Sequence, residues 1–164
     1  MSTTNTQPPA RSLPIAAGDA APDFVLQNQD RQDWKLAEAV KKGDVVLCFF
    51  PFAFTGVCGT EMKCISGEMA EWQKKGAQVV GVSCDSPFVL KAWAAAEGFS
   101  HDLLSDQHRN VCKAYGIYWA DMNTTQRATV IIGRSAEGRG KVKWVQTRQP
   151  GNAMNWDEVL AKVG

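Results

Sequence analysis

A short apolar run and the turn that follows it constrain the fold of this chain most. Residues 45–50 read Val-Val-Leu-Cys-Phe-Phe, which has the length and the β-branched and aromatic content of a buried strand. Apolar residues then recur at helical spacing from Glu61 to Trp72, so a helix begins shortly after the run ends. The pattern therefore predicts a strand-to-helix turn that carries Cys58 in the first turn of the helix.

The predicted position of Cys58 favours a negatively charged sulfur. The first backbone N–H groups of a helix have no partner within it, and the helix dipole is positive at this end. The dipole alone contributes roughly 0.3–1 kcal/mol to holding a negative charge there. Cys58 is therefore a candidate reactive cysteine.

The rest of the chain indicates a single α/β domain. Residues 1–14 are polar and proline-rich, so we expect a disordered lead, followed by one domain over residues 15–164. Strand and helix patterns alternate and end in a hairpin and a helix, which fits a thioredoxin-like fold with a central mixed sheet flanked by helices. The expected strands cover residues 24–26, 45–50, 77–83, 128–132 and 141–147, and the expected helices cover 36–42, 58–75, 86–97, 109–115 and 155–162.

Charge and composition exclude several classes of partner. The chain has 18 basic and 17 acidic residues spread along its length, so no broad field attracts nucleic acid or an anionic membrane. Six tryptophans are dispersed without a basic stripe, which argues against a surface for single-stranded nucleic acid. No apolar run approaches the length of a membrane span, and residues 1–10 lack the pattern of a secretion signal. We expect a cytoplasmic protein.

The cysteines and histidines indicate neither a disulfide framework nor a metal site. Five cysteines are an odd number in a chain of this size, so at least one thiol stays unpaired within the monomer. His101 and His108 have no ligand at helical or CxxC spacing. We expect no metal and no bound cofactor.

Several residues near Cys58 suit the reduction of a peroxide by a thiol. This chemistry needs a thiolate, a small pocket, and donors that stabilise the charge on the departing oxygen. Thr55 can turn its hydroxyl toward the sulfur or a bound peroxide, and the N–H groups of Val57 and Cys58 face outward at the helix start. Pro51 has no N–H, so it can shield the sulfur and fix the entry of the loop.

The site also needs a cation. Arg127 opens the predicted strand 128–132, and if that strand neighbours the central one, its guanidinium reaches both sulfur and peroxide. Glu61 lies about one helical turn beyond Cys58 and can orient an arginine. Taken singly, Thr55 and Glu61 are ordinary capping residues and Arg127 is a solvated charge at a strand end. Their joint occurrence favours a site.

These residues resemble a known family. Pro51, Thr55 and Cys58 reproduce the Pro-x-x-x-Thr-x-x-Cys signature of peroxiredoxins, Glu61 matches an acidic position that often follows it, and Arg127 begins a segment similar to the distal arginine segment of the family. The resemblance covers most of residues 15–160. It points to the bacterial one-cysteine branch related to alkyl hydroperoxide reductase E, with the bacterioferritin-comigratory branch next.

The resemblance implies reduction of hydrogen peroxide or organic hydroperoxides through a sulfenic acid on Cys58. It also implies a homodimer, with Phe52 and Phe54 as contacts. An external thiol reductant would recycle the sulfenic acid, in the form of a thioredoxin-like protein, a glutaredoxin-like protein or a low-molecular-weight thiol.

Two cysteines are candidates for an internal resolving role. Cys64 follows Cys58 by six residues, where the bacterioferritin-comigratory type often has five, and six helical residues rise about 9 Å. A disulfide tolerates a Cα separation of roughly 7 Å at most, so the helix would have to unwind. Cys84 closes the predicted strand 77–83 and should emerge at the same sheet edge as Cys58. We expect Cys48 to be a core residue and Cys112 to pack in a helix.

Two other functions compete with a peroxidase. A thiol-disulfide oxidoreductase normally has CxxC in this turn, and Cys58-Gly59-Thr60-Glu61 lacks the second sulfur. The alternative from another class is a redox-responsive binding or chaperone protein in which oxidation of Cys58 is a signal. The sequence does not separate that alternative from catalysis.

Overall fold

A mixed sheet of seven strands forms the centre of the molecule. The structure is a computed structural model that describes residues 8–164. The strand order is β2-β1-β5-β4-β3-β8-β9, and β3 is parallel to β4 and antiparallel to β8. The strands of this sheet are β1 (Val25–Asn28), β2 (Asp33–Lys35), β3 (Val45–Phe49), β4 (Gln78–Ser83), β5 (Leu103–Ser105), β8 (Arg127–Ile132) and β9 (Val142–Arg148), while β6 (Tyr118–Trp119) and β7 (Thr124–Thr125) form a separate pair.

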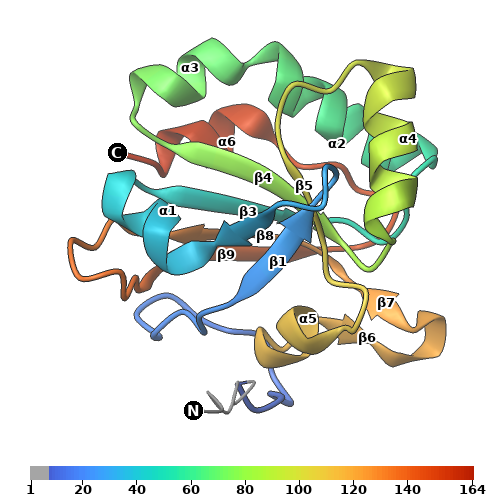
Figure 1. Cartoon of the computed structure of the whole chain (residues 1–164). Coiled ribbons are helices and arrows are strands. Elements are labelled where there is room, and N and C mark those ends of the chain that lie inside the picture. Colours follow the sequence, from blue (N-terminus) through green and yellow to red (C-terminus); the bar gives the residue numbers. More distant parts are fainter. Residues whose placement is uncertain (1–7) are drawn as a thin grey trace.

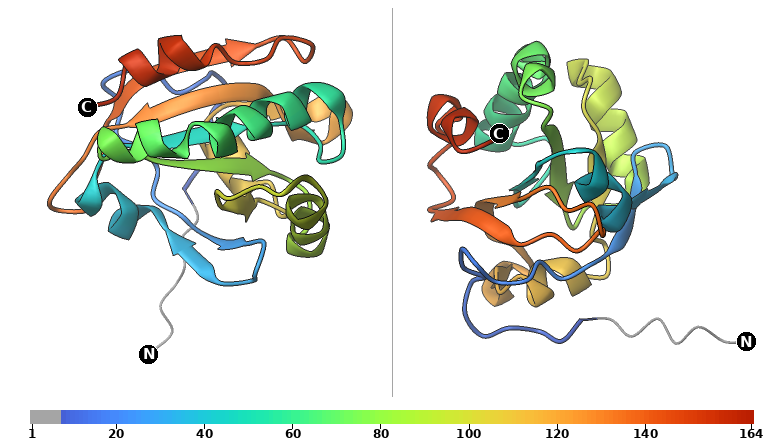
Figure 2. Two further views of the ribbon diagram at one scale, coloured as in Figure 1. Left: turned by 90° about the horizontal axis from the view of Figure 1, so that it is seen from above. Right: turned by 90° about the vertical axis from the view of Figure 1, so that its left-hand side faces the viewer.

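Helices cover both faces of the sheet, as Figures 1 and 2 show. One face is covered by α2 (Gly56–Gly67), α3 (Met69–Lys74), α4 (Pro87–Glu97) and α6 (Trp156–Ala161), and we call it the α2 face. The opposite face packs against α5 (Asn110–Ala114) and α1 (Leu36–Lys42), and we call it the α5 face. A short 3-10 helix, η1 (Ala120–Met122), connects β6 to β7.

The two faces explain why the run at β3 is apolar throughout. Successive side chains of a strand point to opposite faces, so Val45, Leu47 and Phe49 join the core of the α5 face. Val46 and Cys48 join the core of the α2 face. A strand that is buried on both faces has no alternation of apolar and polar residues, and this explains the continuous apolar run in the sequence.

The predicted fold class is confirmed, and most expected elements lie where the sequence places them. α1 has the expected bounds, and α4 begins at Pro87 with Ser86 as its N-cap, accepting a hydrogen bond from the Val89 N–H at 3.3 Å. β8 and β9 form the expected antiparallel hairpin. The short strands β2, β5, β6 and β7 were not expected, because two or three residues are too few to show a period.

The helix expected over residues 58–75 is two helices. α2 ends at Gly67 and α3 starts at Met69, with Glu68 between them at φ −106° and ψ 16°. Glycine costs a helix roughly 1 kcal/mol relative to alanine, which makes Gly67 a natural place for the break. The N–H of Glu68 is shared between the carbonyls of Cys64 and Ile65, at 3.1 and 3.2 Å.

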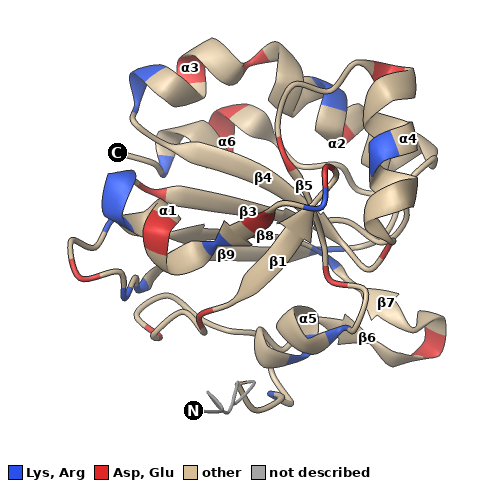
Figure 3. Cartoon of the chain, in the orientation of Figure 1, with Lys and Arg blue, Asp and Glu red and all other residues tan. Residues whose placement is uncertain are grey.

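The predicted N-terminal lead falls partly outside the described residues, which begin at residue 8. Residues 8–14 form neither helix nor strand, and the Arg11 N–H donates to the carbonyl of Lys113 at 2.9 Å. The division into a lead and a domain stays a prediction. Figure 3 shows basic and acidic residues interspersed over the chain, and none of the described helices is long and apolar enough to cross a membrane.

Candidate active site

The turn between β3 and α2 presents Cys58 at the start of a helix. Thr55 is the N-cap, α2 begins at Gly56, and Cys58 is its third residue. The first hydrogen bond of the helix runs from the Gly59 N–H to the Thr55 carbonyl at 2.9 Å, so the N–H groups of residues 56–58 have no partner within the helix. The expected position of Cys58 in the first turn is confirmed. Its side chain is buried, with a relative exposure of 1%.

Two hydrogen bonds from other segments of the chain hold the loop before the helix in place. The buried Pro51 accepts a bond at its carbonyl from the Thr124 hydroxyl at 2.8 Å. The Ala53 N–H donates to the Asp85 carboxylate at 2.9 Å. Phe54 follows with a φ of 61°, a left-handed conformation that is unfavourable for a bulky residue. Such backbone is retained where surrounding contacts impose it, and it is common near active sites.

The Thr55 hydroxyl points back into this loop. It donates to the Phe52 carbonyl at 2.7 Å, and the residue is exposed. The expected orientation toward the sulfur is therefore not the one seen. The oxygen keeps lone pairs for a further hydrogen bond, but its proton is engaged.

Arg127 reaches the sulfur from the neighbouring strand. β8 pairs with β3, as the sequence argument required, and Arg127 is the first residue of β8. Its Nη2 donates to the Cys58 Sγ at 3.1 Å, its Nη1 is paired with Glu61, and its Nε donates to the Pro150 carbonyl at 3.0 Å. Each nitrogen of the guanidinium thus has a partner, so its plane is fixed beside the sulfur.

A second arginine completes the cluster, and sequence analysis missed it. Arg148 lies directly opposite Arg127 in the β8–β9 register, and its Nη2 donates to the Glu61 Oε2 at 3.0 Å. The same oxygen accepts the Met154 N–H at 2.9 Å. Two guanidinium groups against one carboxylate leave an excess positive charge beside the Cys58 sulfur.

The other cysteines of the α2 face have different surroundings. Cys48 is buried in β3, where desolvation, and secondarily the charge of Glu61, raise the pKa of its thiol well above its usual range. Its expected place in the core is confirmed. Cys64 lies on α2 with Cys58 and is half-buried, beside a cavity of about 130 Å³ that Trp72 and Trp156 also line.

Cys84 lies on the α5 face and not with Cys58. It follows β4, so it does emerge at the same end of the sheet, but it packs in the core of the opposite face. Its Sγ is 4.0 Å from the Sγ of Cys112, which is buried in α5 as expected. Within residues 8–164, Cys84, Cys112 and Asp106 form the one group of three or more His, Cys, Asp or Glu residues close enough to share a metal ion, with ligand atoms within 4.8 Å of one another.

Known proteins share this architecture and sequence. The family model described as the AhpC/TSA family matches residues 17–145. Alkyl hydroperoxide reductase E of Mycobacterium tuberculosis is 32% identical over 152 residues, covering 90% of this chain and 97% of the relative. Peroxiredoxin Bcp of Escherichia coli is 34% identical over 105 residues, covering 64% of this chain and 67% of the relative. The crystal structure of peroxidoxin BcpB from Mycobacterium tuberculosis superposes with a TM-score of 0.81 at 27% identity, covering 90% of this chain and 96% of that one. The chain therefore belongs to the AhpC/TSA family and is a peroxiredoxin.

Proposed function

We propose that this peroxiredoxin reduces hydrogen peroxide and organic hydroperoxides with Cys58 as the nucleophile. The observation that carries the proposal is the contact of 3.1 Å between the Arg127 Nη2 and the Cys58 Sγ. Glu61 holds that guanidinium, and Arg148 holds Glu61. A fixed cation beside a sulfur at a helix N-terminus is the environment in which a thiolate is stable and reactive.

The reaction transfers one peroxide oxygen to the sulfur. The Cys58 thiolate attacks one oxygen, the S–O bond forms as the O–O bond breaks, and the other oxygen leaves as water or alcohol after taking up a proton. Arg127 stabilises the thiolate before attack and the departing oxygen during it. The N–H groups of Val57 and Cys58 serve as further donors. The Thr55 hydroxyl binds the peroxide after it rotates away from the Phe52 carbonyl. Pro51 limits access of water to the sulfur. The product on the protein is a sulfenic acid.

An external thiol returns Cys58 to the reduced state. Cys58 and Cys64 lie on the same uninterrupted helix, where six residues rise about 9 Å, and Cys84 packs on the other face of the sheet. After one equivalent of peroxide we expect mainly a sulfenic acid that a trapping reagent captures. Intact mass of the wild type, Cys64→Ser and Cys84→Ser checks this. A rapid loss of two hydrogens in the wild type that is absent in one variant would identify that cysteine as resolving.

The proposal extends to the reductant, the cellular compartment and the oligomeric state. The reductant is a thioredoxin- or glutaredoxin-like protein or a low-molecular-weight thiol, and the compartment is the cytoplasm. The functional unit is a homodimer with Phe52 and Phe54 at the contact. The exposure of Phe54 supports a contact here, because this large apolar residue of the active-site loop is 59% exposed.

Steady-state consumption of peroxide tests the proposal. We expect sustained turnover with at least one of three donors: a thioredoxin system, a glutaredoxin system and glutathione. The donor that supports the highest kcat/KM names the class of reductant. If Cys58 is oxidised once and no donor sustains turnover, the peroxidase proposal fails and a signalling role takes its place.

A further inference from the structure

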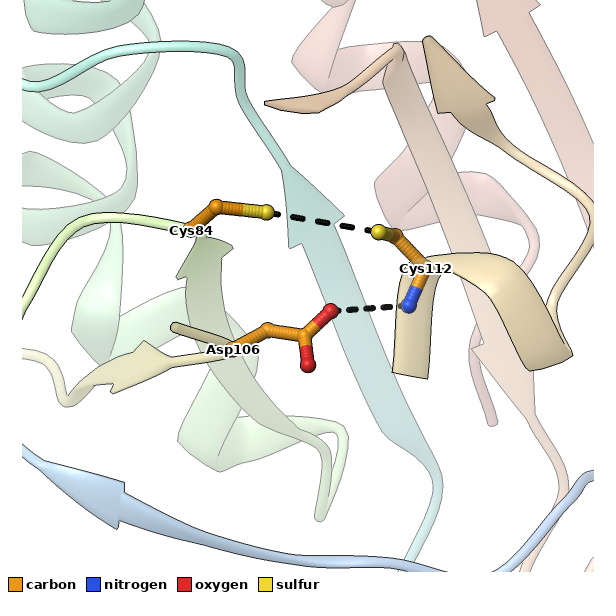
Figure 4. Close-up of side chains that lie close together, drawn as sticks. All are labelled: Cys84, Asp106 and Cys112. Carbon is orange, nitrogen blue, oxygen red and sulfur yellow. Dashed lines mark hydrogen bonds between the residues drawn. The ribbon is translucent and has the colours of Figure 1, made fainter. Parts of the chain in front are cut away.

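We propose that Cys84 and Cys112 form a second redox site, which closes an intramolecular disulfide on the α5 face of the sheet without the participation of Cys58. This inference goes beyond the proposed peroxidase activity and does not depend on it. Figure 4 shows the two sulfurs facing each other, Cys84 from the end of β4 and Cys112 from α5. The separation of 4.0 Å puts the two sulfurs within hydrogen-bond distance of each other.

The sheet separates this pair from the proposed peroxide site. Cys84 and Cys112 belong to the core cluster of the α5 face, and Cys58 belongs to that of the α2 face. A disulfide bond of about 2.05 Å requires the two sulfurs to approach by about 2 Å from their present positions. α5 has only five residues, so a small shift of this helix disturbs few hydrogen bonds.

The two thiols are unequal, and the difference assigns their roles. The hydrogen bond with Cys112 lowers the pKa of the Cys84 thiol, while the same bond, followed by burial, raises the pKa of Cys112. Cys84 is also slightly exposed, at 8%, whereas Cys112 is fully buried. The greater exposure of Cys84 makes it the sulfur that reacts first, and the fully buried Cys112 is the sulfur that closes the bond.

The oxidant is a hydroperoxide or another small two-electron oxidant of thiols. The Cys84 thiolate attacks one oxygen of hydrogen peroxide, the O–O bond breaks, and hydroxide leaves and is protonated to water. The Cys112 sulfur then attacks the resulting sulfenic acid, the S–S bond forms, and the hydroxyl leaves as a second water with the Cys112 proton. Two thiols are oxidised and one peroxide is reduced. Asp106, whose carboxylate lies within 4.8 Å of both sulfurs, lines a cavity of about 510 Å³.

A metal ion is the competing occupant of this cluster, and the contacts of Asp106 argue against it. Both carboxylate oxygens already accept backbone N–H groups, Oδ1 from Val111 at 3.1 Å and Oδ2 from Cys112 at 2.8 Å. The carboxylate therefore caps α5. Burial also raises the pKa of Asp106, which disfavours the charged form that a metal needs. Zinc in a structural site takes four ligands, and the described residues supply three.

The test uses the full chain with Cys58→Ser, so that oxidation of Cys58 cannot contribute. The reduced protein, which retains four of the five cysteines, is treated with diamide or with hydrogen peroxide, denatured and alkylated, and its free thiols are counted by mass. We expect two of the four thiols to be lost, with a mass decrease of two hydrogens and a peptide that links Cys84 to Cys112. Retention of all four thiols, or a link between other cysteines, would overturn the proposal.

Matched variants and a metal assay complete the experiment. Adding Cys84→Ala or Cys112→Ala should abolish the link, whereas Cys48→Ala, which also removes a buried thiol, should leave it intact. The linked peptide is read in the Cys58→Ser protein itself, so the result does not depend on the folding of these variants. Native mass spectrometry of the protein as purified gives the metal content. If the purified protein holds one zinc per chain and Cys112→Ala removes it, the cluster is a metal site and the disulfide proposal is overturned.

Discussion

The two faces of the central sheet each bury cysteine sulfur, and they surround it differently. On the α2 face, Cys58 lies 3.1 Å from the guanidinium of Arg127, with Glu61 and Arg148 behind it. On the α5 face, Cys84 and Cys112 lie 4.0 Å from each other beside the carboxylate of Asp106. The Cys58 sulfur therefore has a cation as its partner, whereas the sulfurs of Cys84 and Cys112 contact each other and lie near a carboxylate.

This difference shows that burial does not by itself select a reactive cysteine. Desolvation disfavours any thiolate, as the raised pKa of Cys48 illustrates at the centre of β3. At Cys58 a surplus of positive charge and an open helix start lie beside the sulfur. At Cys112 the hydrogen bond with the Cys84 thiol, and secondarily the nearby carboxylate of Asp106, add to the rise in pKa that burial causes. The charges that the surrounding strands and helices bring to a sulfur therefore decide its chemistry.

The largest expected effect comes from removing the sulfur that has the cation. Cys58→Ser should abolish peroxide reduction on the α2 face, leaving at most the one peroxide per chain that formation of the Cys84–Cys112 disulfide consumes. Cys48→Ser and Cys112→Ser should retain the chemical step at Cys58, because neither residue has a cationic partner. Stopped-flow peroxide consumption by the reduced variants measures this. Rates are scored on folded protein, since a buried hydroxyl without a partner destabilises the core. Full activity in Cys58→Ser would show that Cys58 is not the sulfur that reduces peroxide.

Removing the cation is the next most severe change. Arg127→Ala should slow peroxide attack by about tenfold to a thousandfold, by analogy with deletion of one preorganised donor. Arg127→Lys should recover little, because an ammonium cannot span the sulfur, Glu61 and the Pro150 carbonyl. The stopped-flow rate of the reduced protein is the measurement. An unchanged rate in Arg127→Ala would place this residue outside the site.

Arg148 should have a smaller effect, because it touches Glu61 and not the sulfur. We expect Arg148→Ala to reduce the same rate by roughly tenfold, which is typical of losing a residue that orients a functional group. Arg148→Lys should recover most of the rate, since its contact with Glu61 is a single one at 3.0 Å. This rescue separates positioning from mere stability. Equal losses in the alanine and lysine variants would show that Arg148 does not act through its charge.

The smallest effect concerns His101, which is buried on the α2 face and has no charged partner among residues 8–164. Burial lowers the pKa of His101 to about 4. In the neutral tautomer with the proton on Nε2, the ring accepts a hydrogen bond at Nδ1 from the Ser66 hydroxyl at 2.8 Å and donates from Nε2 to the Met62 Sδ at 3.3 Å. The unfolded chain binds the proton more readily, with a pKa of about 6.5. This contribution to stability is therefore present above pH 6.5 and is lost as the pH falls toward 4.

Chemical denaturation at several pH values checks the histidine prediction. The free energy of unfolding should fall by about 3 kcal/mol from this group between pH 6.5 and 4. His101→Gln should remove that part of the pH dependence, while His108→Gln, at an exposed position, serves as the matched control. Identical pH dependence in the wild type and His101→Gln would contradict the assignment.

Much of the fold and part of the site could be predicted from the sequence, because the relevant signals are local. The apolar run of β3, the serine and proline that start α4, and the placement of Cys58 in the first turn of α2 depend on neighbouring residues only. The break at Gly67 was missed because apolar spacing continues across it. The pairing of β3 with β8 was expected conditionally, and it brings Arg127 to the sulfur.

The sequence by itself determined the composition of the turn: a proline, a threonine and a cysteine at fixed spacing, with an acid one helical turn beyond. Only the tertiary structure decided the partners that come from far along the chain. The register of β9 on β8 puts Arg148 opposite Arg127, and the packing of α5 puts Cys112 against Cys84 rather than leaving Cys84 with Cys58. The physical reason is that strand register and face are set by the burial of many side chains together, and a shift of one residue would reverse the face of every one of them.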